Sequence, residues 1–228
     1  MKSFALLLSA AVAQKVQVAL YYESLCPYCQ DTITGSFANA FATPGFLDMA
    51  DVLLVPYGNA HEAASGDSWT FTCQHGVDEC AYNQIESCSN FYISDPITAF
   101  NFINCVESND SKRKSTYESV LATCSATVSA DEFAGIQSCW TSQQGIDLEH
   151  ANALLTDALV PSHQYVPWLV GQGVHTDDIQ SQIESDLLGY VCANYTGANR
   201  AAACDQATPV KSTSNAEYCY PTATQFLQ

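Results

Sequence analysis

The chain has 228 residues, 47% of them hydrophobic, and 24 Asp and Glu residues against 7 Lys and Arg give it a formal net charge of −17 at pH 7. That hydrophobic content argues against global disorder, and the length suits one domain with an insertion or two small domains. The negative charge argues against nucleic acid and anionic membranes as partners, because both would repel an acidic protein.

The first 13 residues are typical of a signal peptide: Lys2 is followed by an apolar stretch over residues 4–10 and a small-residue cleavage site at residues 11–13. A buried N-terminal helix is the alternative. No other apolar run approaches the length of a membrane span, so we expect a soluble protein that folds in an oxidising compartment. Eleven cysteines agree with that compartment. Two glycosylation sequons begin at Asn109 and Asn194.

Residues 15–57 predict a strand, a helix and a second strand. Residues 15–22 are rich in Val, Leu and Tyr, and residues 26–41 place apolar side chains at helical spacing. Pro44-Gly45 ends this helix, and residues 51–57 form a buried-looking strand. This order indicates a βαβ unit with two parallel strands.

Residues 59–160 have a different character, with six cysteines and several helical patterns. We expect a helical insertion here. Its predicted helices cover residues 78–91, a stretch capped by Ser94, a stretch opened by a capping box at Ser129, and residues 148–159.

Residues 165–174 return to strand character, with a hairpin turn at residues 171–173, and residues 176–192 predict a last helix. The tail, residues 193–228, has little periodicity, and we expect Cys204 and Cys219 to tie it down. The predicted fold class is α/β: a thioredoxin-like domain over residues 14–192 with a helical, cysteine-rich insertion.

The sequence Cys26-Pro27-Tyr28-Cys29 stands where the first strand meets the first long helix. Disulfide exchange needs one thiolate to attack and a second thiol to resolve the mixed disulfide. At a helix start, free N–H groups stabilise a Cys26 thiolate, and Cys29, one turn further on, would resolve. Half of a zinc site and a structural disulfide are the alternatives. Since there is no second Cys-x-x-Cys, we expect no metal ligands.

The sequence Val166-Pro167 precedes the last predicted strand. In a thioredoxin fold, a cis proline at this point lies against the Cys-x-x-Cys and leaves backbone groups free to pair with substrate. We therefore expect Val166 and Pro167 to bind substrate. An ordinary trans proline at a strand start is the alternative.

A longer motif lies inside the insertion. It has the form Cys-Gln-His-Gly-x-x-Glu-Cys-x-x-Asn-x-x-x-x-Cys, at Cys73, Gln74, His75, Gly76, Glu79, Cys80, Asn83 and Cys88. Together with the Cys-x-x-Cys and the Tyr-Val-Pro-Trp segment, it resembles the gamma-interferon-inducible lysosomal thiol reductase (GILT) family over about residues 16–192. The resemblance implies a soluble glycoprotein of the endosomal–lysosomal pathway that reduces protein disulfides at acidic pH through Cys26 and Cys29.

The proton donor or acceptor is not assigned by sequence. Many thioredoxin-fold enzymes have a buried acid six residues before the first active cysteine, and here that position is Leu20. Glu23 is closer, but we expect it to be a solvated surface carboxylate. His75 and His163 are candidates for proton transfer or tuning, with a structural role as the alternative for His75.

The predicted function is a thiol–disulfide oxidoreductase that needs no cofactor. Its partners would be disulfide-containing proteins and an external thiol reductant, in the lysosome or outside the cell. The alternatives are a disulfide oxidase or isomerase and a non-catalytic, disulfide-braced binding protein. Without Cys26 and Cys29, nine cysteines remain, so four disulfides would leave an odd one, free or linking a homodimer.

Overall fold

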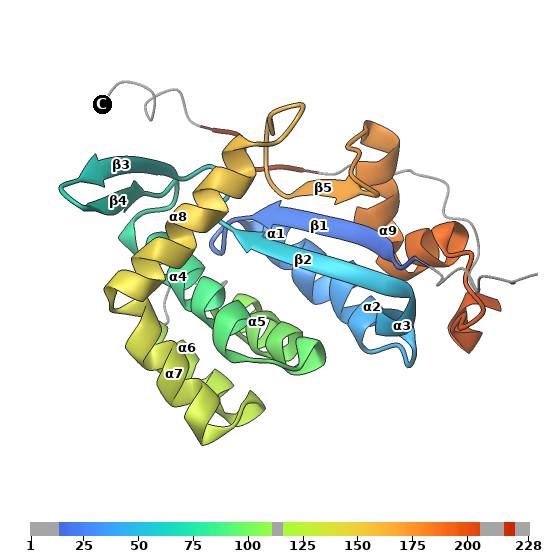
Figure 1. Ribbon diagram of the computed structural model, residues 1–228, viewed down its shortest axis with the longest axis horizontal. Helices are drawn as coiled ribbons and strands as arrows, with labels where there is room; N and C mark the ends of the chain where they lie inside the picture. Colours follow the sequence, from blue (N-terminus) through green and yellow to red (C-terminus); the bar gives the residue numbers. More distant parts are fainter. Residues whose placement is uncertain (1–13, 111–115, 206–216, 222–228) are drawn as a thin grey trace, which may run out of the picture.

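The computed structural model describes residues 14–110, 116–205 and 217–221. Figure 1 shows a small sheet covered by helices on one side of the molecule and a group of helices on the other. The expected signal peptide lies outside the described residues. In the part of the chain that is described, no helix is both long and apolar enough to cross a membrane.

The predicted βαβ unit is present. Strand β1 (Val16–Tyr22) is mostly buried and pairs in parallel with β2 (Ala50–Pro56) along its whole length. The connecting segment contains α1 (Pro27–Thr32), the π-helical turn η1 (Ile33–Phe37), α2 (Ala38–Phe41) and α3 (Phe46–Met49). The apolar side chains at helical spacing in this segment pack against the sheet in the main core.

Strand β5 (Trp168–Gly171) pairs antiparallel with β1, so the strand order is β2-β1-β5 and β1 is central. Helix α9 (Asp177–Asn194) packs on the same core, and the Thr176 hydroxyl caps it by accepting from the Ile179 N–H. After it, the short helix η3 (Ala202–Asp205) is tied to α9 by the Cys192–Cys204 disulfide.

The insertion forms a second body beside β2, with its own core (Figure 1). Its elements are β3 (His61–Ser65), β4 (Ser68–Thr72), α4 (Val77–Tyr92), α5 (Pro96–Asp110), α6 (Tyr117–Cys124), η2 (Ser125–Thr127), α7 (Ala130–Trp140) and α8 (Gln143–Asp157). Disulfides join α4 to α7 through Cys88–Cys139 and α5 to α6 through Cys105–Cys124.

Three details differ from the sequence predictions. The insertion begins with the hairpin β3–β4, which we did not predict. Asp95, not Ser94, caps α5, since its carboxylate accepts from the Thr98 N–H at 2.8 Å. The second arm of the hairpin after β5 consists of a single bridge between Gly171 and Val174. The capping box at Ser129 is confirmed.

Candidate active site

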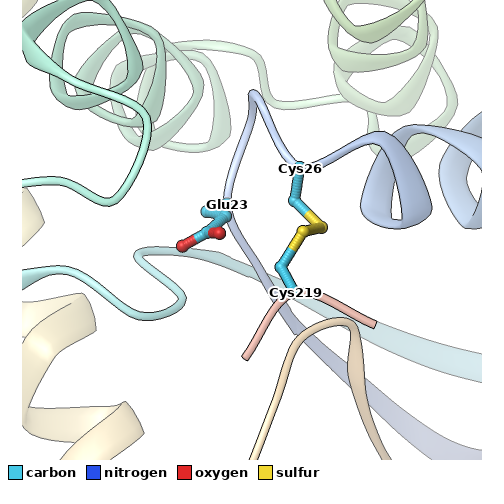
Figure 2. A group of neighbouring side chains, drawn as sticks. All are labelled: Glu23, Cys26 and Cys219. Carbon is cyan, nitrogen blue, oxygen red and sulfur yellow. A yellow bond between two sulfur atoms is a disulfide. The ribbon is translucent and has the colours of Figure 1, made fainter. Parts of the chain in front are cut away.

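The Cys26 sulfur is bonded to the tail rather than to Cys29. Cys26 stands at the N-cap of α1, directly after the loop that follows β1, and forms a disulfide of 2.09 Å with Cys219. Cys29 is a buried free thiol, the one cysteine of the eleven that forms no disulfide. Figure 2 shows the tail strand reaching Cys26 across the end of the sheet. Of the nine cysteines other than Cys26 and Cys29, eight form four disulfides among themselves and Cys219 is left over. In this structure Cys219 is bonded to Cys26 of the same chain.

Val166 and Pro167 lie at the same place. The Val166–Pro167 peptide bond is cis, as the sequence predicts, and a second cis bond precedes Pro161. The Val166 carbonyl oxygen lies 3.9 Å from the Cys26 sulfur. Val166 also exchanges two backbone hydrogen bonds of 2.9 Å with Cys219, as one hydrogen-bonded pair of an antiparallel ladder.

The surface position that we expected for Glu23 is wrong. Its side chain is fully buried, and its carboxylate lies within 4.8 Å of the Cys26 and Cys219 sulfurs (Figure 2). One oxygen accepts from the Asn59 N–H at 2.9 Å. Gly58 makes this approach possible, because a side chain there would start 2.7 Å from the Glu23 Cβ. The sequence signal was available: Glu23 follows a strand that ends buried and precedes the Cys-x-x-Cys by three residues.

Burial changes the acidity of the two groups beside the disulfide. Burial, and then the charge of Glu79, raise the pKa of the Glu23 carboxyl well above its ordinary value. Burial, and then the charge of Glu23, raise the pKa of the Cys29 thiol well above its ordinary value. Cys29 therefore needs a base to become a thiolate, and the Glu23 carboxylate is the charged group that acts most strongly on its thiol.

The long motif of the insertion forms the wall of this site. The His75 Nδ1 atom lies 2.5 Å from the Glu79 carboxylate and 3.5 Å from Glu23. The Asn83 side chain accepts from the Ser24 N–H at 3.1 Å. The Cys73–Cys80 disulfide closes the loop that carries His75. The motif thus fixes the segment between β1 and Cys26, which sequence reasoning could not infer.

These contacts also bear on metal binding. Glu23, His75 and Glu79 present ligand atoms within 4.8 Å of one another. The close pairing of His75 with Glu79, however, already engages two of those groups as a hydrogen bond. A second group adds Cys26 and Cys219 to Glu23, but their sulfurs are joined in a disulfide and are not thiolate ligands.

The remaining sequence candidates are found elsewhere. His163 is partly buried, and burial lowers its pKa; its charged neighbours are Asp157 and His61 rather than the cysteines. Asn109 lies in α5, with its amide donating to the Cys105 carbonyl, and Asn194 is exposed at the end of α9.

Comparison with known proteins agrees with this geometry. The family model "Gamma interferon inducible lysosomal thiol reductase (GILT)" matches residues 17–128. The gamma-interferon-inducible lysosomal thiol reductase of Carassius auratus is 37% identical over 211 residues, which cover 91% of this chain and 78% of that protein. The mouse protein of the same name is also 37% identical, over 83% of this chain and 71% of its own length.

The chain belongs to the GILT family. Solved structures show the same fold at low sequence identity. The reduced form of DsbG from Mycobacterium tuberculosis has a TM-score of 0.52 at 17% identity, with 90% of this chain and 91% of that chain covered. Reduced DsbA from the same organism has a TM-score of 0.51 at 16% identity, over 87% and 92% of the two chains. The thioredoxin-like fold with a helical insertion is therefore confirmed.

As a GILT-family member the protein is a thiol–disulfide oxidoreductase, as its sequence predicts. The match over residues 17–128 includes the Cys-x-x-Cys and the long motif, which both contribute residues to the site. Val166 and Cys219 lie beyond that range, and the structure brings both to Cys26.

Proposed function

We propose that this enzyme reduces protein disulfides, with Cys26 as the nucleophile and Cys29 as the resolving thiol. The observation that carries the proposal is the Cys26–Cys219 bond. Cys26 is joined to a cysteine in a segment that pairs with Val166, while Cys29 remains a free thiol. This is the arrangement of a mixed disulfide between an enzyme and a bound substrate segment.

The reaction follows from that arrangement. The Cys26 thiolate attacks one sulfur of the substrate disulfide, and the other substrate sulfur leaves as a thiolate that takes a proton. Glu23 in its ionised form accepts the proton of Cys29, and the Cys29 thiolate attacks the Cys26 sulfur. The first substrate sulfur then leaves as a thiolate and is protonated. Two electrons have passed to substrate, and the enzyme holds a Cys26–Cys29 disulfide that an external thiol must reduce.

The remaining sequence expectations belong to the same proposal. Val166 and Pro167 pair with the substrate backbone, and His75 tunes proton transfer through its contact with Glu23. The GILT relatives are named as lysosomal, which supports an acidic endosomal–lysosomal or extracellular site of action. Asn109 and Asn194 would carry glycans. Once released from Cys26, Cys219 is the thiol through which two chains could be linked.

Trapping tests the roles of the two cysteines, and the structure dictates its design. In Cys29→Ser alone, Cys219 would occupy Cys26, so the trap needs Cys29→Ser combined with Cys219→Ser. With insulin as substrate at pH 5, we expect this double variant to accumulate a mixed disulfide, visible by non-reducing electrophoresis and mass spectrometry.

The matched control is Cys26→Ser combined with Cys219→Ser, which should neither trap nor reduce insulin. Full activity in that variant would contradict the assignment of Cys26. Faster oxidation of reduced proteins than reduction of insulin by the Cys219→Ser chain would favour the oxidase alternative.

A further inference from the structure

The tail segment 217–221 is held at the site by more than its disulfide. The Cys219 carbonyl oxygen accepts from the Val166 N–H at 2.9 Å and from the Asn59 side-chain amide at 3.0 Å. The Gln74 side-chain amide donates to the Tyr220 carbonyl at 2.7 Å. Asn59 and Gln74 are themselves joined by a hydrogen bond of 2.8 Å. Together they form a polar rail for an extended backbone.

Asn59 and Gln74 bind backbone carbonyl oxygens, as the exposed edges of sheets do when they bind peptides. In such recognition, backbone hydrogen bonds hold the peptide, and alternate side chains give specificity. With the tail in place Asn59 is almost fully buried, and its hydrogen bonds to Gln74 and to the Cys219 carbonyl hold its amide in one orientation. Any extended segment with a cysteine opposite Cys26 can present the same two carbonyl oxygens.

The side chains on either side of Cys219 contact one aromatic residue of the enzyme. In an extended segment they point away from the face that carries the cysteine. The Tyr218 ring stacks on Tyr165 with ring centroids 4.0 Å apart, and the Tyr220 ring meets Tyr165 at 5.7 Å in an edge-on arrangement. The Tyr218 hydroxyl also donates to the Glu184 carboxylate at 3.3 Å.

Tyr165 is supported from behind. Its ring contacts Trp168 at 5.1 Å, and the Trp168 ring stacks on His175 at 3.4 Å. Trp168 belongs to β5 and is buried, so this aromatic group is part of the fold rather than a mobile surface. A rigid aromatic platform beside the nucleophile favours aromatic partners over small or charged ones.

We infer that Asn59, Gln74 and Tyr165 form a peptide-binding site for substrate cysteines that lie in extended segments with aromatic residues on both sides, and that the tail around Cys219 is its internal occupant. The inference rests on the proposed function and specifies its substrate. Asn59 and Gln74 bind the backbone of every such segment, whereas Tyr165 selects its side chains. The tail matches the site because its own sequence around the cysteine is Tyr218-Cys219-Tyr220.

Two peptides test the selectivity with the full-length Cys219→Ser chain, in which the tail cannot bond to Cys26. Their sequences are Glu-Tyr-Cys-Tyr-Pro and Glu-Ala-Cys-Ala-Pro, each carrying glutathione on its cysteine. Cys26 displaces glutathione, Cys29 then displaces the peptide thiol, and dithiothreitol reduces the enzyme again. We expect kcat/KM at pH 5 to be about tenfold higher for the tyrosine peptide, since ring pairs of this kind are worth such a factor.

Variants separate the two parts of the site. Tyr165→Ala in the Cys219→Ser chain should reduce the preference to less than about twofold, and Tyr165→Phe, the matched control, should keep it. Gln74→Ala should lower kcat/KM for both peptides by a similar factor, because Gln74 contacts only the backbone.

The outcomes are distinguishable. Equal kcat/KM for the two peptides in the Cys219→Ser chain, with insulin still reduced, would overturn the inference and leave the proposed function standing. Loss of all activity, against insulin and both peptides, would overturn both. If Tyr165→Ala does not fold, the comparison of peptides on the Cys219→Ser chain still decides the matter.

Discussion

Glu23 is where the sequence and the structure differ most. From the sequence we expected this carboxylate, three residues before the nucleophile, to lie on the surface. It is instead buried near Asn59, His75 and the sulfurs of Cys26 and Cys219. A buried acid with a raised pKa is costly to the fold, because its charged form lacks solvation. Such a cost is typical of functional sites, where it adjusts acidity for proton transfer.

Replacing Glu23 by Gln should therefore separate activity from stability. The amide keeps the shape and can still accept from Asn59, but it cannot take the Cys29 proton. We expect the turnover of insulin to fall about tenfold or more, with release of the trapped substrate becoming the slow step. Stopped-flow measurement of mixed-disulfide decay between pH 4 and pH 8 would show the loss of its pH dependence.

Although Glu23→Gln should lose activity, it should gain stability at alkaline pH. A folded-state pKa raised above the unfolded value means that the stabilising contribution is present in acid and is lost as the pH rises. Glu23→Gln should therefore unfold at a higher temperature than the native chain at pH 8. Glu62→Gln is the matched control, because Glu62 also pairs with a histidine, His150, but away from the cysteines. Unchanged turnover in Glu23→Gln would remove this residue from the mechanism.

At the scale of elements, the five disulfides divide into two kinds. Three of them lie within the insertion, and the fourth joins η3 to α9. The fifth joins the tail to Cys26, one helical turn from the free Cys29. Cys29 can displace Cys219 from Cys26, and no other disulfide in the described residues has a free cysteine to attack it.

We therefore predict that Cys26–Cys219 opens first under mild reduction. Mass spectrometric mapping after titration with glutathione should show this pair lost while the other four remain intact. Cys29→Ser should slow its opening by at least about tenfold, because attack from within the chain is faster than attack from solution. Opening of Cys73–Cys80 at the same glutathione concentration would instead indicate that the long motif is itself a redox site.

Several elements could be predicted from sequence because their patterns are strong. The apolar runs of β1 and β2 and the helical spacing of α4 and α9 are recognisable without the structure. The hairpin β3–β4 was missed because all of its strand residues are half-buried or exposed, so no alternation of buried and exposed side chains marks it. The pairing of Cys219 with Cys26 could not be derived either, since it depends on where a tail without periodicity crosses the sheet.

At the scale of the whole molecule, buried acids set the pH dependence of stability. Burial raises the pKa of Glu86 to about 8 and that of Glu149 well above its ordinary value, and burial also raises the pKa of Glu184. With Glu23, these carboxyls are protonated in the folded state at a pH where the unfolded chain would ionise them. Their stabilisation is complete below about pH 4.5 and is lost as the pH rises toward 8.

We predict a higher unfolding temperature at pH 5 than at pH 8, by several degrees or more, because one unit of pKa shift corresponds to about 1.4 kcal/mol. Differential scanning calorimetry across this range measures it. Glu86→Gln should flatten the dependence, since the amide can still accept from Tyr22. Asp51→Asn, at an exposed position, serves as the control. A protein more stable at pH 8 than at pH 5 would contradict this account.

The large sequence separation between Cys26 and Cys219 affects the stability of the protein. The bond joins residues separated by 193 positions, so it turns nearly the whole fold into a covalent ring. In the chain-entropy model, a ring of this size destabilises the unfolded chain by about 5 kcal/mol, whereas the four-residue ring of a Cys26–Cys29 bond contributes only about 2 kcal/mol. The exchange that empties the peptide site keeps the number of disulfides constant but gives up about 3 kcal/mol of that constraint. The form with an emptied peptide site is thus easier to unfold than the form in which the tail is bonded to Cys26.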